Sequence, residues 1–325
     1  MDIGFYLKWP VGMQSVPGWN VIGDELYANS LCAHLKKRDI ISSANIYAPN
    51  LLPDKPLDIM VYLNDTSPIN EYAEKHVLYL QNIYGNNSLN ILQKLRENNY
   101  DGYMFISKNL TDIHIKEGYS GLYLPFGVDT DLFYPRDPES EYKFEVCYVG
   151  NDIKGEQRTT RYLLPAVNFN LGLFGNWAIP KLPIKEKINS LRKRNKISAY
   201  RKNLAKISKG KIPQEKVPVL YSSSKINLNF SHQDCVEWDI TTLRTYEVLA
   251  CKGFLISDIV KSAKEELSDG MVFTDGFDDL TEKISYYLNE KKERDRISEK
   301  GYLYVTSNCT MNSRVKQLIE YIKSI

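Results

Sequence analysis

Short apolar segments alternate with helical patterns along the chain, and this alternation constrains the fold more than any other feature. In the first half, segments rich in β-branched and aromatic residues are separated by patterns of helical period. Nearly continuous apolar strands with helices between them are typical of a parallel sheet covered on both faces. The predicted strands are Ile3–Leu7, Ala44–Tyr47, Asp58–Leu63, Val77–Leu80, Gly102–Ile106 and Leu122–Pro125, and the predicted helices are Gly23–Lys37, Ser88–Asn98 and Leu110–Glu117.

The same alternation restarts after residue 143. Two prolines and clustered charge make 129–143 the predicted linker between an N-terminal domain, 1–128, and a C-terminal domain, 144–325. The sequence therefore predicts an α/β protein with two doubly wound, Rossmann-like domains that face each other across a cleft, with the last helix crossing back to the N-terminal domain. The predicted strands of the second domain are Phe144–Val149, Leu171–Phe174, Ile226–Phe230, Phe254–Ile256 and Val272–Phe273, and charged helices fill 278–325.

Several classes of protein are excluded by what the sequence lacks. No apolar run approaches the roughly 18 to 20 residues that a membrane span needs, and the N-terminal MDIGFYLKW has no basic signal-peptide region. The five cysteines are scattered and form no CxxC pair, so we expect neither a disulfide framework nor a zinc site, and a cytoplasmic location is the simplest expectation. No GxGxxG motif follows the first strand of either domain, which argues against a dinucleotide oxidoreductase.

The segment YVGNDIKGEQRTTRYLLP, residues 148–165, predicts an anion site. A strand ends at Val149, a turn begins at Gly150, and Lys154 and Arg158 lie ahead of or within the next helix. Backbone N–H groups at a helix N-terminus, with basic side chains beside them, bind anions. A solvated helix surface is the alternative interpretation of these cations, and Arg161 is the weaker candidate among them.

The segment DITTLRTYEVLACKGFLISD, residues 239–258, predicts a second part of that site. The free amides of Thr242, Leu243 and Arg244 at the start of a helix favour a diphosphate. Two turns into this segment, Glu247 is placed to accept hydrogen bonds from ribose hydroxyls, as carboxylates do in dinucleotide-binding folds. The alternative is that Glu247 is a solvated helix residue.

These motifs resemble those of the GT-B glycosyltransferases. The passage PFGVDTDLFYP at 125–135 is similar to the interdomain passage of that superfamily, and Asp239 and Glu247 have the D-x7-E spacing of its retaining E-x7-E enzymes. Residues 217–323 resemble most closely the CgeB-like (spore-maturation) branch. The resemblance implies a nucleotide-diphosphate sugar as donor, with UDP- or GDP-sugars favoured, and diphosphate contacts from Lys154 and Arg158. It also implies retention of anomeric configuration and no required metal or cofactor. Asp stands at 239 where the family has Glu, so Glu237 is an alternative sugar contact.

Acceptor-side residues are predicted at the carboxyl ends of the N-terminal strands. The loop after the first strand carries Gly12 and Gln14, and the next candidates are Asn64, Asp65 and Asn82. The resemblance implies a cleft residue with a catalytic role after the fourth strand, where Gln81 stands, beside the catalytic candidates Asp239 and Glu247.

A basic insertion is predicted over residues 184–211. From Lys185 to Lys211 there are eleven Lys or Arg side chains and one Glu. A solvated helix face is one interpretation, and contact with a polyanion such as DNA, or with an anionic membrane surface, is the other.

The sequence thus predicts a glycosyltransferase, a hexosyl- or pentosyltransferase that moves a sugar from a nucleotide sugar to an unidentified acceptor. A glycan, a lipid-linked acceptor and a polyanion all remain open as acceptors. The alternatives are a glycosyltransferase that acts on DNA through the basic insertion and a non-catalytic binding protein with the same fold.

Overall fold

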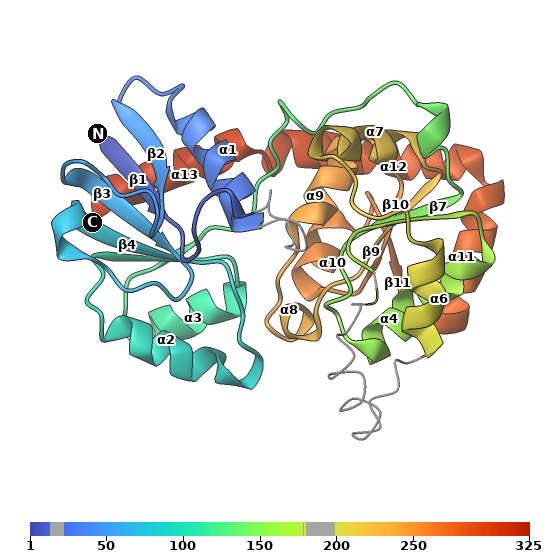
Figure 1. Cartoon of the computed structure of the whole chain (residues 1–325), viewed down its shortest axis with the longest axis horizontal. Coiled ribbons are helices and arrows are strands. Elements are labelled where there is room, and N and C mark those ends of the chain that lie inside the picture. Colours follow the sequence, from blue (N-terminus) through green and yellow to red (C-terminus); the bar gives the residue numbers. More distant parts are fainter. Residues whose placement is uncertain (14–22, 178, 180–198) are drawn as a thin grey trace, which may run out of the picture.

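The chain folds into two parallel sheets, each with helices on both faces (Figure 1). The structure, a computed structural model, describes residues 1–13, 23–177, 179 and 199–325. The first sheet has the strand order β2-β1-β3-β4-β5-β6, and the second has the order β11-β10-β9-β7-β8. The predicted fold class, two doubly wound α/β domains, is confirmed.

The N-terminal sheet follows the predicted apolar segments closely. Its neighbouring strands are parallel throughout, as in the pairing of Ile3 with Ile59 and of Val77 with Gly102. The strands are β1 (Asp2–Tyr6), β2 (Ser43–Tyr47), β3 (Leu57–Leu63), β4 (Ala73–Leu80), β5 (Gly102–Phe105) and β6 (Leu122–Tyr123), and the helices are α1 (Gly23–Leu35), α2 (Ser88–Arg96) and α3 (Lys108–Lys116).

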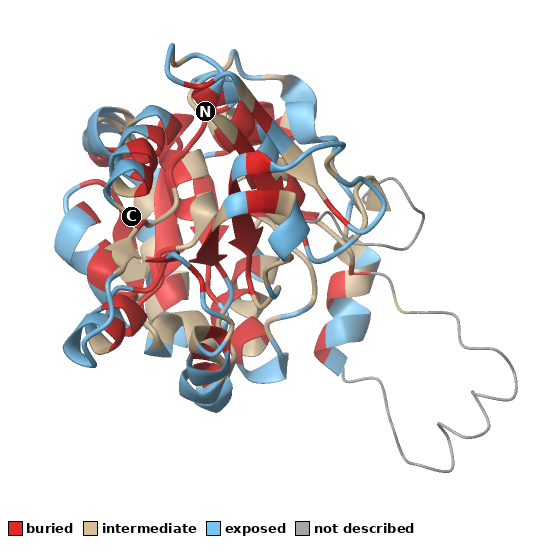
Figure 2. Cartoon of the chain, turned by 90° about the vertical axis from the view of Figure 1, so that its left-hand side faces the viewer, coloured by how far each residue is buried: buried red, intermediate tan, exposed pale blue. Residues whose placement is uncertain are grey.

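Both faces of this sheet are covered by helices. Residues that point to either face are therefore apolar, so the strands are apolar along most of their length. One face packs against α1, with Phe5 and Leu31 in a shared core cluster, and the other packs against α2 and α3, with Leu78, Leu92 and Leu110 in another. In Figure 2, buried strands lie between helices whose outer surfaces are exposed.

The C-terminal sheet is also covered on both faces. Leu220, Leu249 and Val305 share one core cluster, and Leu204 and Ile284 share another on the opposite face. The strands are β7 (Val146–Val149), β8 (Leu171–Phe174), β9 (Ile226–Asn229), β10 (Leu255–Asp258) and β11 (Val272–Thr274). The helices are α4 (Glu156–Tyr162), α6 (Ala199–Ile207), α7 (Val217–Ser223), α8 (Gln233–Glu237), α9 (Leu243–Ala250), α10 (Lys261–Leu267), α11 (Phe277–Asn289), α12 (Lys291–Asn308) and α13 (Met311–Ser324).

Two segments of chain connect the domains, and they are hydrogen-bonded to each other. The backbone of Val128 pairs with that of the α12–α13 junction, accepting from the Met311 N–H at 2.8 Å and donating to the Cys309 carbonyl at 2.8 Å. Asp129 is buried and accepts a hydrogen bond from Ser30 of α1. The passage that follows Val128 is therefore held against α1 where it begins.

Helix α13 leaves the C-terminal domain and packs on the N-terminal sheet (Figure 1). Val315, Leu318 and Ile322 are buried in the same core cluster as β1 and α1. The Tyr321 hydroxyl accepts from the Tyr103 N–H at 2.8 Å, at the start of β5. The N-terminal core is thus completed by residues from the other end of the chain.

We expect the substitution Leu318→Ala to lower the free energy of unfolding of the N-terminal domain by about 2 to 4 kcal/mol, because it leaves a cavity in a closed core. Leu318 has no exposed surface. Urea denaturation measures the change, and Lys316→Ala on the exposed side of the same helix is the matched control. Equal stability of the two variants would contradict the packing described for α13.

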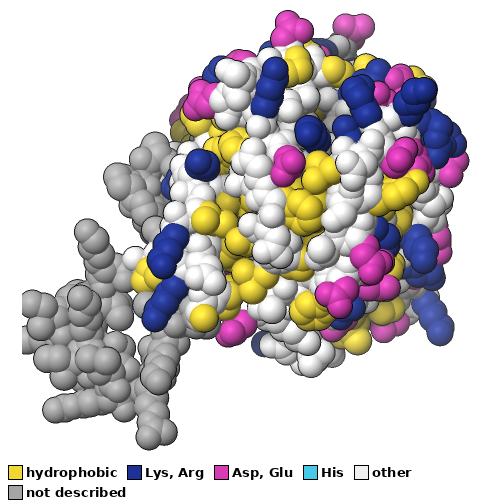
Figure 3. Space-filling view, turned by 90° about the vertical axis from the view of Figure 1, so that its right-hand side faces the viewer, with side chains coloured by type: hydrophobic (Ala, Val, Ile, Leu, Met, Phe, Trp, Pro, Cys, Tyr) yellow, Lys and Arg dark blue, Asp and Glu magenta, His cyan; other side chains and the backbone are white. Residues whose placement is uncertain are grey.

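Within the described residues, no helix combines the length and apolar character needed to cross a bilayer. Residues 184–198 of the predicted basic insertion, 184–211, lie outside the described part of the chain. Its described end forms α6, whose Tyr200 and Leu204 are buried, while Arg201 is paired with Asp152 at 2.5 Å. On the outer face of the C-terminal domain, Lys and Arg side chains are interspersed with Asp and Glu (Figure 3).

Candidate active site between the domains

Helix α9 begins with an uncapped turn. Thr242 has extended backbone angles, φ −73° and ψ 150°, and its side chain accepts no hydrogen bond from the helix. Its hydroxyl instead accepts from the Asn229 side-chain amide at 3.1 Å. Among the described residues, the backbone N–H groups of Thr242, Leu243 and Arg244 have no hydrogen-bond partner. These amides point along the helix axis toward its start, where the positive end of the helix dipole favours an anion.

Glu247 is half-buried one turn further along α9. Its carboxylate has no hydrogen-bond or ion-pair partner among the described residues. Burial raises the pKa of Glu247 to about 7, against the opposing effect of the Arg244 charge. A carboxylate that has lost water without gaining donors costs stability, and such groups are enriched in binding sites. Glu247 is therefore not an ordinary solvated helix residue.

Arg244 is held beside Glu247 by the last residue of β9. Its Nη1 donates to the Asn229 Oδ1 at 3.1 Å, and its guanidinium lies 5.7 Å from the centre of the Tyr148 ring. Asn229 also donates to the Thr245 hydroxyl at 3.2 Å. The buried side-chain amide of Asn229 thus orients the start of α9 and Arg244 together, and Tyr221 is a further hydrogen-bond partner of the Arg244 guanidinium.

Lys154 lies in the turn after β7, as the sequence predicts, and is half-buried. Its ammonium makes no hydrogen bond or ion pair with any described residue and lies 5.8 Å from the centre of the Phe230 ring. Burial, and then the positive charge of Arg244, lower the pKa of Lys154 to about 8. Two cations that lie close enough to repel each other favour the binding of a doubly charged anion.

Gly150 begins the turn that follows β7 and lies close to the Tyr148 ring. Its N–H donates to the Phe174 carbonyl at 2.9 Å. A Cβ at this position would lie 2.7 Å from the Tyr148 hydroxyl, closer than real Cβ contacts. A side chain at position 150 would therefore displace either the turn or the buried ring of Tyr148.

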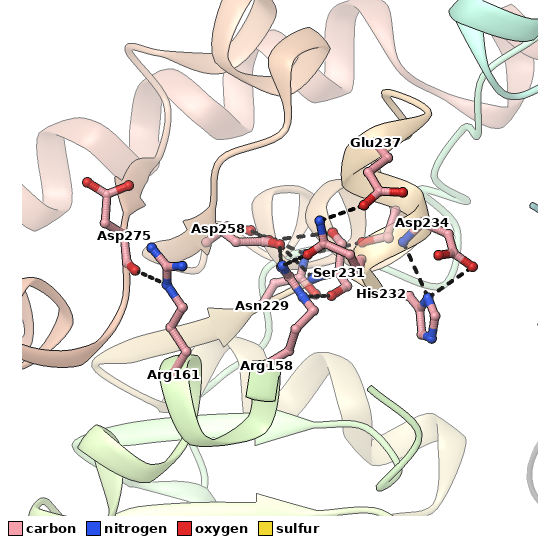
Figure 4. Close-up of polar contacts among 12 residues, drawn as sticks. Arg158, Arg161, Asn229, Ser231, His232, Asp234, Glu237, Asp258 and Asp275 are labelled. Atoms are coloured by element: carbon pink, nitrogen blue, oxygen red, sulfur yellow. Dashed lines mark hydrogen bonds and ion pairs between the residues drawn. The ribbon is translucent and has the colours of Figure 1, made fainter. Parts of the chain in front are cut away.

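Arg158 and Arg161 are hydrogen-bonded to protein partners (Figure 4). Arg158 is buried, donates to the Ser231 carbonyl at 2.6 Å and to Gln233 at 2.8 Å, and forms an ion pair with Asp258. The Nε of Arg161 donates to the Asp275 carbonyl. The predicted diphosphate contact of Arg158 is therefore not part of the site proposed below, because its guanidinium joins α4 to the ends of β9 and β10.

Asp239 adopts a left-handed backbone conformation, φ 57°, and its carboxylate turns toward α10. It is buried and accepts from the Ser262 N–H at 2.7 Å, so it caps the start of that helix. The Oδ1 of Asp239 is therefore occupied by this hydrogen bond. Only the Oδ2 could make the predicted contact with a sugar. Glu237, the alternative, is exposed on α8 and accepts from Gln233 at 3.0 Å (Figure 4).

The predicted acceptor-side residues fall into different environments. Asn64 is buried, donates to Asp24 at 2.8 Å and accepts from the Gln81 N–H at 3.0 Å. The side-chain amide of Gln81 is buried and has no hydrogen-bond partner in the described part of the chain. Asp65 pairs with Lys8 at 2.8 Å. Of the remaining candidates, the Gly12 N–H donates to Glu25, Asn82 is exposed, and Gln14 lies outside the described residues.

Three residues of this region had no place in the sequence predictions. Asn229, Ser231 and Asp258 stand at or just beyond the carboxyl ends of β9 and β10 and organise Arg244 and Arg158. A polar residue that ends a buried strand is the signal that would have identified them, because this edge of a parallel sheet faces the ligand.

Comparisons with known proteins agree with this geometry. Residues 163–320 match the model of a family described as glycosyl transferase-like. The fold is that of GT-B glycosyltransferases, and the family match supports a glycosyltransferase. No curated protein matches the chain in sequence.

Three solved structures illustrate the shared fold. Sucrose-phosphate synthase from Thermosynechococcus elongatus has a TM-score of 0.68 and 13% identity over 99% of this chain and 98% of that chain. HepE from Anabaena, solved with UDP-glucose, has a TM-score of 0.65 and 12% identity over 100% of both chains. BGT from T4 phage, solved with its substrate UDP-glucose, has a TM-score of 0.59 and 13% identity over 98% of both chains.

Proposed function

We propose that the protein transfers a sugar from a UDP-sugar to an acceptor bound between the two domains. The observation that carries the proposal is the juxtaposition of Glu247 with two cations, Lys154 and Arg244, at the start of α9. Neither the Glu247 carboxylate nor the first amides of α9 have a hydrogen-bond partner among the residues that the structure describes. A nucleoside diphosphate has the complementary groups, namely ribose hydroxyls that donate and a diphosphate that accepts.

The residues divide the work of catalysis between them. Lys154, Arg244 and the α9 amides stabilise the negative charge that develops on the departing diphosphate, in a half-buried site where such interactions are stronger than in water. Glu247 fixes the ribose and therefore the position of the sugar–phosphate bond. UDP is the proposed donor nucleotide because HepE and BGT are described with UDP or UDP-glucose bound.

The finer parts of the proposal rest on the D-x7-E spacing of Asp239 and Glu247. We place the chain with the retaining, metal-independent enzymes of this type, near the CgeB-like branch, and in the cytoplasm. Proton NMR of the product anomer tests retention, and activity after treatment with EDTA tests the metal requirement. An inverted product or full loss of activity in EDTA would overturn the corresponding part.

A thermal-shift and hydrolysis screen tests the central proposal. We expect UDP to raise the unfolding temperature more than GDP, ADP or dTDP at equal concentration, because a ligand that binds only the folded state stabilises it. We also expect slow release of UDP from at least one UDP-sugar in the absence of an acceptor. A protein that neither binds UDP nor hydrolyses any UDP-sugar is not a transferase of this kind.

A further inference from the structure

A groove outside the anion site joins the two domains. Helix α8 of the C-terminal domain faces α3 and the 3-10 turn at Gly85–Asn87 of the N-terminal domain across a cavity of about 460 Å³. The residues that line it are Asn86, Asn109, Asp112, Ile113, Glu237 and Trp238. Both domains contribute, so the groove exists only when the domains are together.

Trp238 fixes this arrangement by bonding the N-terminal domain at two points. Its indole N–H donates to the Gly85 carbonyl at 3.2 Å, and its own carbonyl accepts from the Ser107 hydroxyl at 2.7 Å. The same chain segment continues through Ile240 into the N-terminal core and reaches Thr242, the first residue of the donor-site turn. The groove is therefore connected to the start of α9 by a short, doubly anchored segment.

The groove has the composition of a saccharide-binding surface. Trp238 and Ile113 supply apolar surface for the C–H groups of a sugar ring, and Trp238 is held in one orientation by its hydrogen bond. The side chains of Asn109, Asp112 and Glu237 are exposed in the groove and offer acceptors and donors to sugar hydroxyls.

The charge of the groove restricts the class of acceptor. Its lining includes two carboxylates, Asp112 and Glu237, and no Lys or Arg among the described residues that form it. A phosphate or uronate placed there would meet two like charges with no cation to offset them. A neutral polyhydroxyl ligand has no such penalty, and neutral sugars are therefore favoured over nucleic acid.

We propose that this groove between α3 and α8 binds the acceptor and that the acceptor presents an uncharged saccharide there. The inference rests on the proposed transferase function and adds the class of acceptor and the residues that recognise it. Asn109 and Asp112 are the residues whose substitution tests it, because both lie exposed on α3 and are remote in sequence from the donor helix.

The experiment measures UDP release from the UDP-sugar that the wild type hydrolyses fastest. Neutral p-nitrophenyl glucoside, galactoside and mannoside are the acceptor probes, and an oligogalacturonate and a DNA duplex are the anionic ones. We expect at least one neutral glycoside to accelerate UDP release and the anionic probes to have no effect. In the double variant Asn109→Ala/Asp112→Ala, the KM for that glycoside rises at least tenfold, while hydrolysis without acceptor and UDP affinity stay unchanged. Lys116→Ala, exposed on the same helix outside the groove, is the control and retains the wild-type KM.

Each other outcome overturns a defined statement. Hydrolysis without stimulation by any neutral glycoside, stimulation by an anionic probe alone, or an unchanged KM in the double variant refutes the acceptor groove and leaves the donor site intact. A wild type that neither binds UDP nor hydrolyses any UDP-sugar refutes the proposed function and this inference with it.

Discussion

Glu247→Gln weakens UDP binding by about 10- to 100-fold and at the same time stabilises the folded protein. The first effect follows because a charged hydrogen bond to ribose, worth about 1.5 to 3 kcal/mol, is lost. The second follows because Glu247 is half-buried, becomes charged as the pH rises through about 7, and has no hydrogen-bond donor among the described residues. Calorimetric titration with UDP measures the first effect, and urea denaturation without ligand measures the second.

The gain in stability has a defined pH dependence. Because the pKa of Glu247 is raised in the folded state to about 7, the folded protein holds a proton that the unfolded chain releases above its ordinary pKa of 4.5. The wild type therefore loses stability as the pH rises from about 4.5 to about 7, and Glu247→Gln removes that loss. We expect the variant to be more stable by about 1 to 3 kcal/mol at pH 8 and nearly unchanged at pH 4.5.

A matched control separates this effect from a general change of surface charge. Glu282→Gln alters an exposed carboxylate on α11 with no hydrogen-bond partner among the described residues. It is expected to change neither UDP affinity nor stability. If Glu247→Gln instead lowers stability and leaves UDP affinity intact, the carboxylate has a structural role and the donor site is elsewhere.

Lys154→Met is expected to reduce UDP affinity by about 10- to 100-fold through loss of one charged contact to the diphosphate. It also removes a pH dependence. With the pKa of Lys154 lowered to about 8, the free wild type loses this positive charge as the pH rises from 7 to 9, and its UDP affinity falls over that range. The variant binds UDP weakly, and the part of the fall in affinity between pH 7 and pH 9 that comes from Lys154 is absent from it. Calorimetric titration at pH 7 and pH 9 compares the two proteins.

Arg161→Met is the control for Lys154. Both cations are near α4, and the sequence alone makes both candidates for the diphosphate. The Nε of Arg161 donates to the Asp275 carbonyl, so we expect the UDP affinity of the control to equal that of the wild type. If Arg161→Met lost more UDP affinity than Lys154→Met, the anion site would lie at the other end of α4.

The positions of the strands and of the start of α9 could be predicted from the sequence, because short segments of neighbouring residues determine them. The strands of both sheets follow apolar segments, and the start of α9 follows its Thr-Thr pair. Lys154 lies near Arg244, as the predicted anion site requires, because the turn that carries it is only a few residues from the end of β7.

Pairing between distant polar residues could not be predicted in this way. Arg158 looked equivalent to Lys154 in sequence, but its partner Asp258 is a hundred residues further along the chain. Asp239 had the spacing of a sugar contact, but its positive φ and the distant Ser262 N–H turn the carboxylate toward α10. The identity of a residue indicates which interactions it can make, and the folded chain decides which of them it makes.

The return of α13 to the N-terminal sheet has a consequence for how the chain is made. The core around Phe5 and Leu31 needs Val315 and Leu318, which a ribosome adds about three hundred residues later. During synthesis, one face of the N-terminal sheet therefore stays partly exposed to solvent until α13 has been translated. We expect residues 1–128 to be poorly soluble when they are expressed alone. Co-expression with residues 129–325 as a separate polypeptide should make them soluble, because α13 of the second polypeptide can then cover the exposed face.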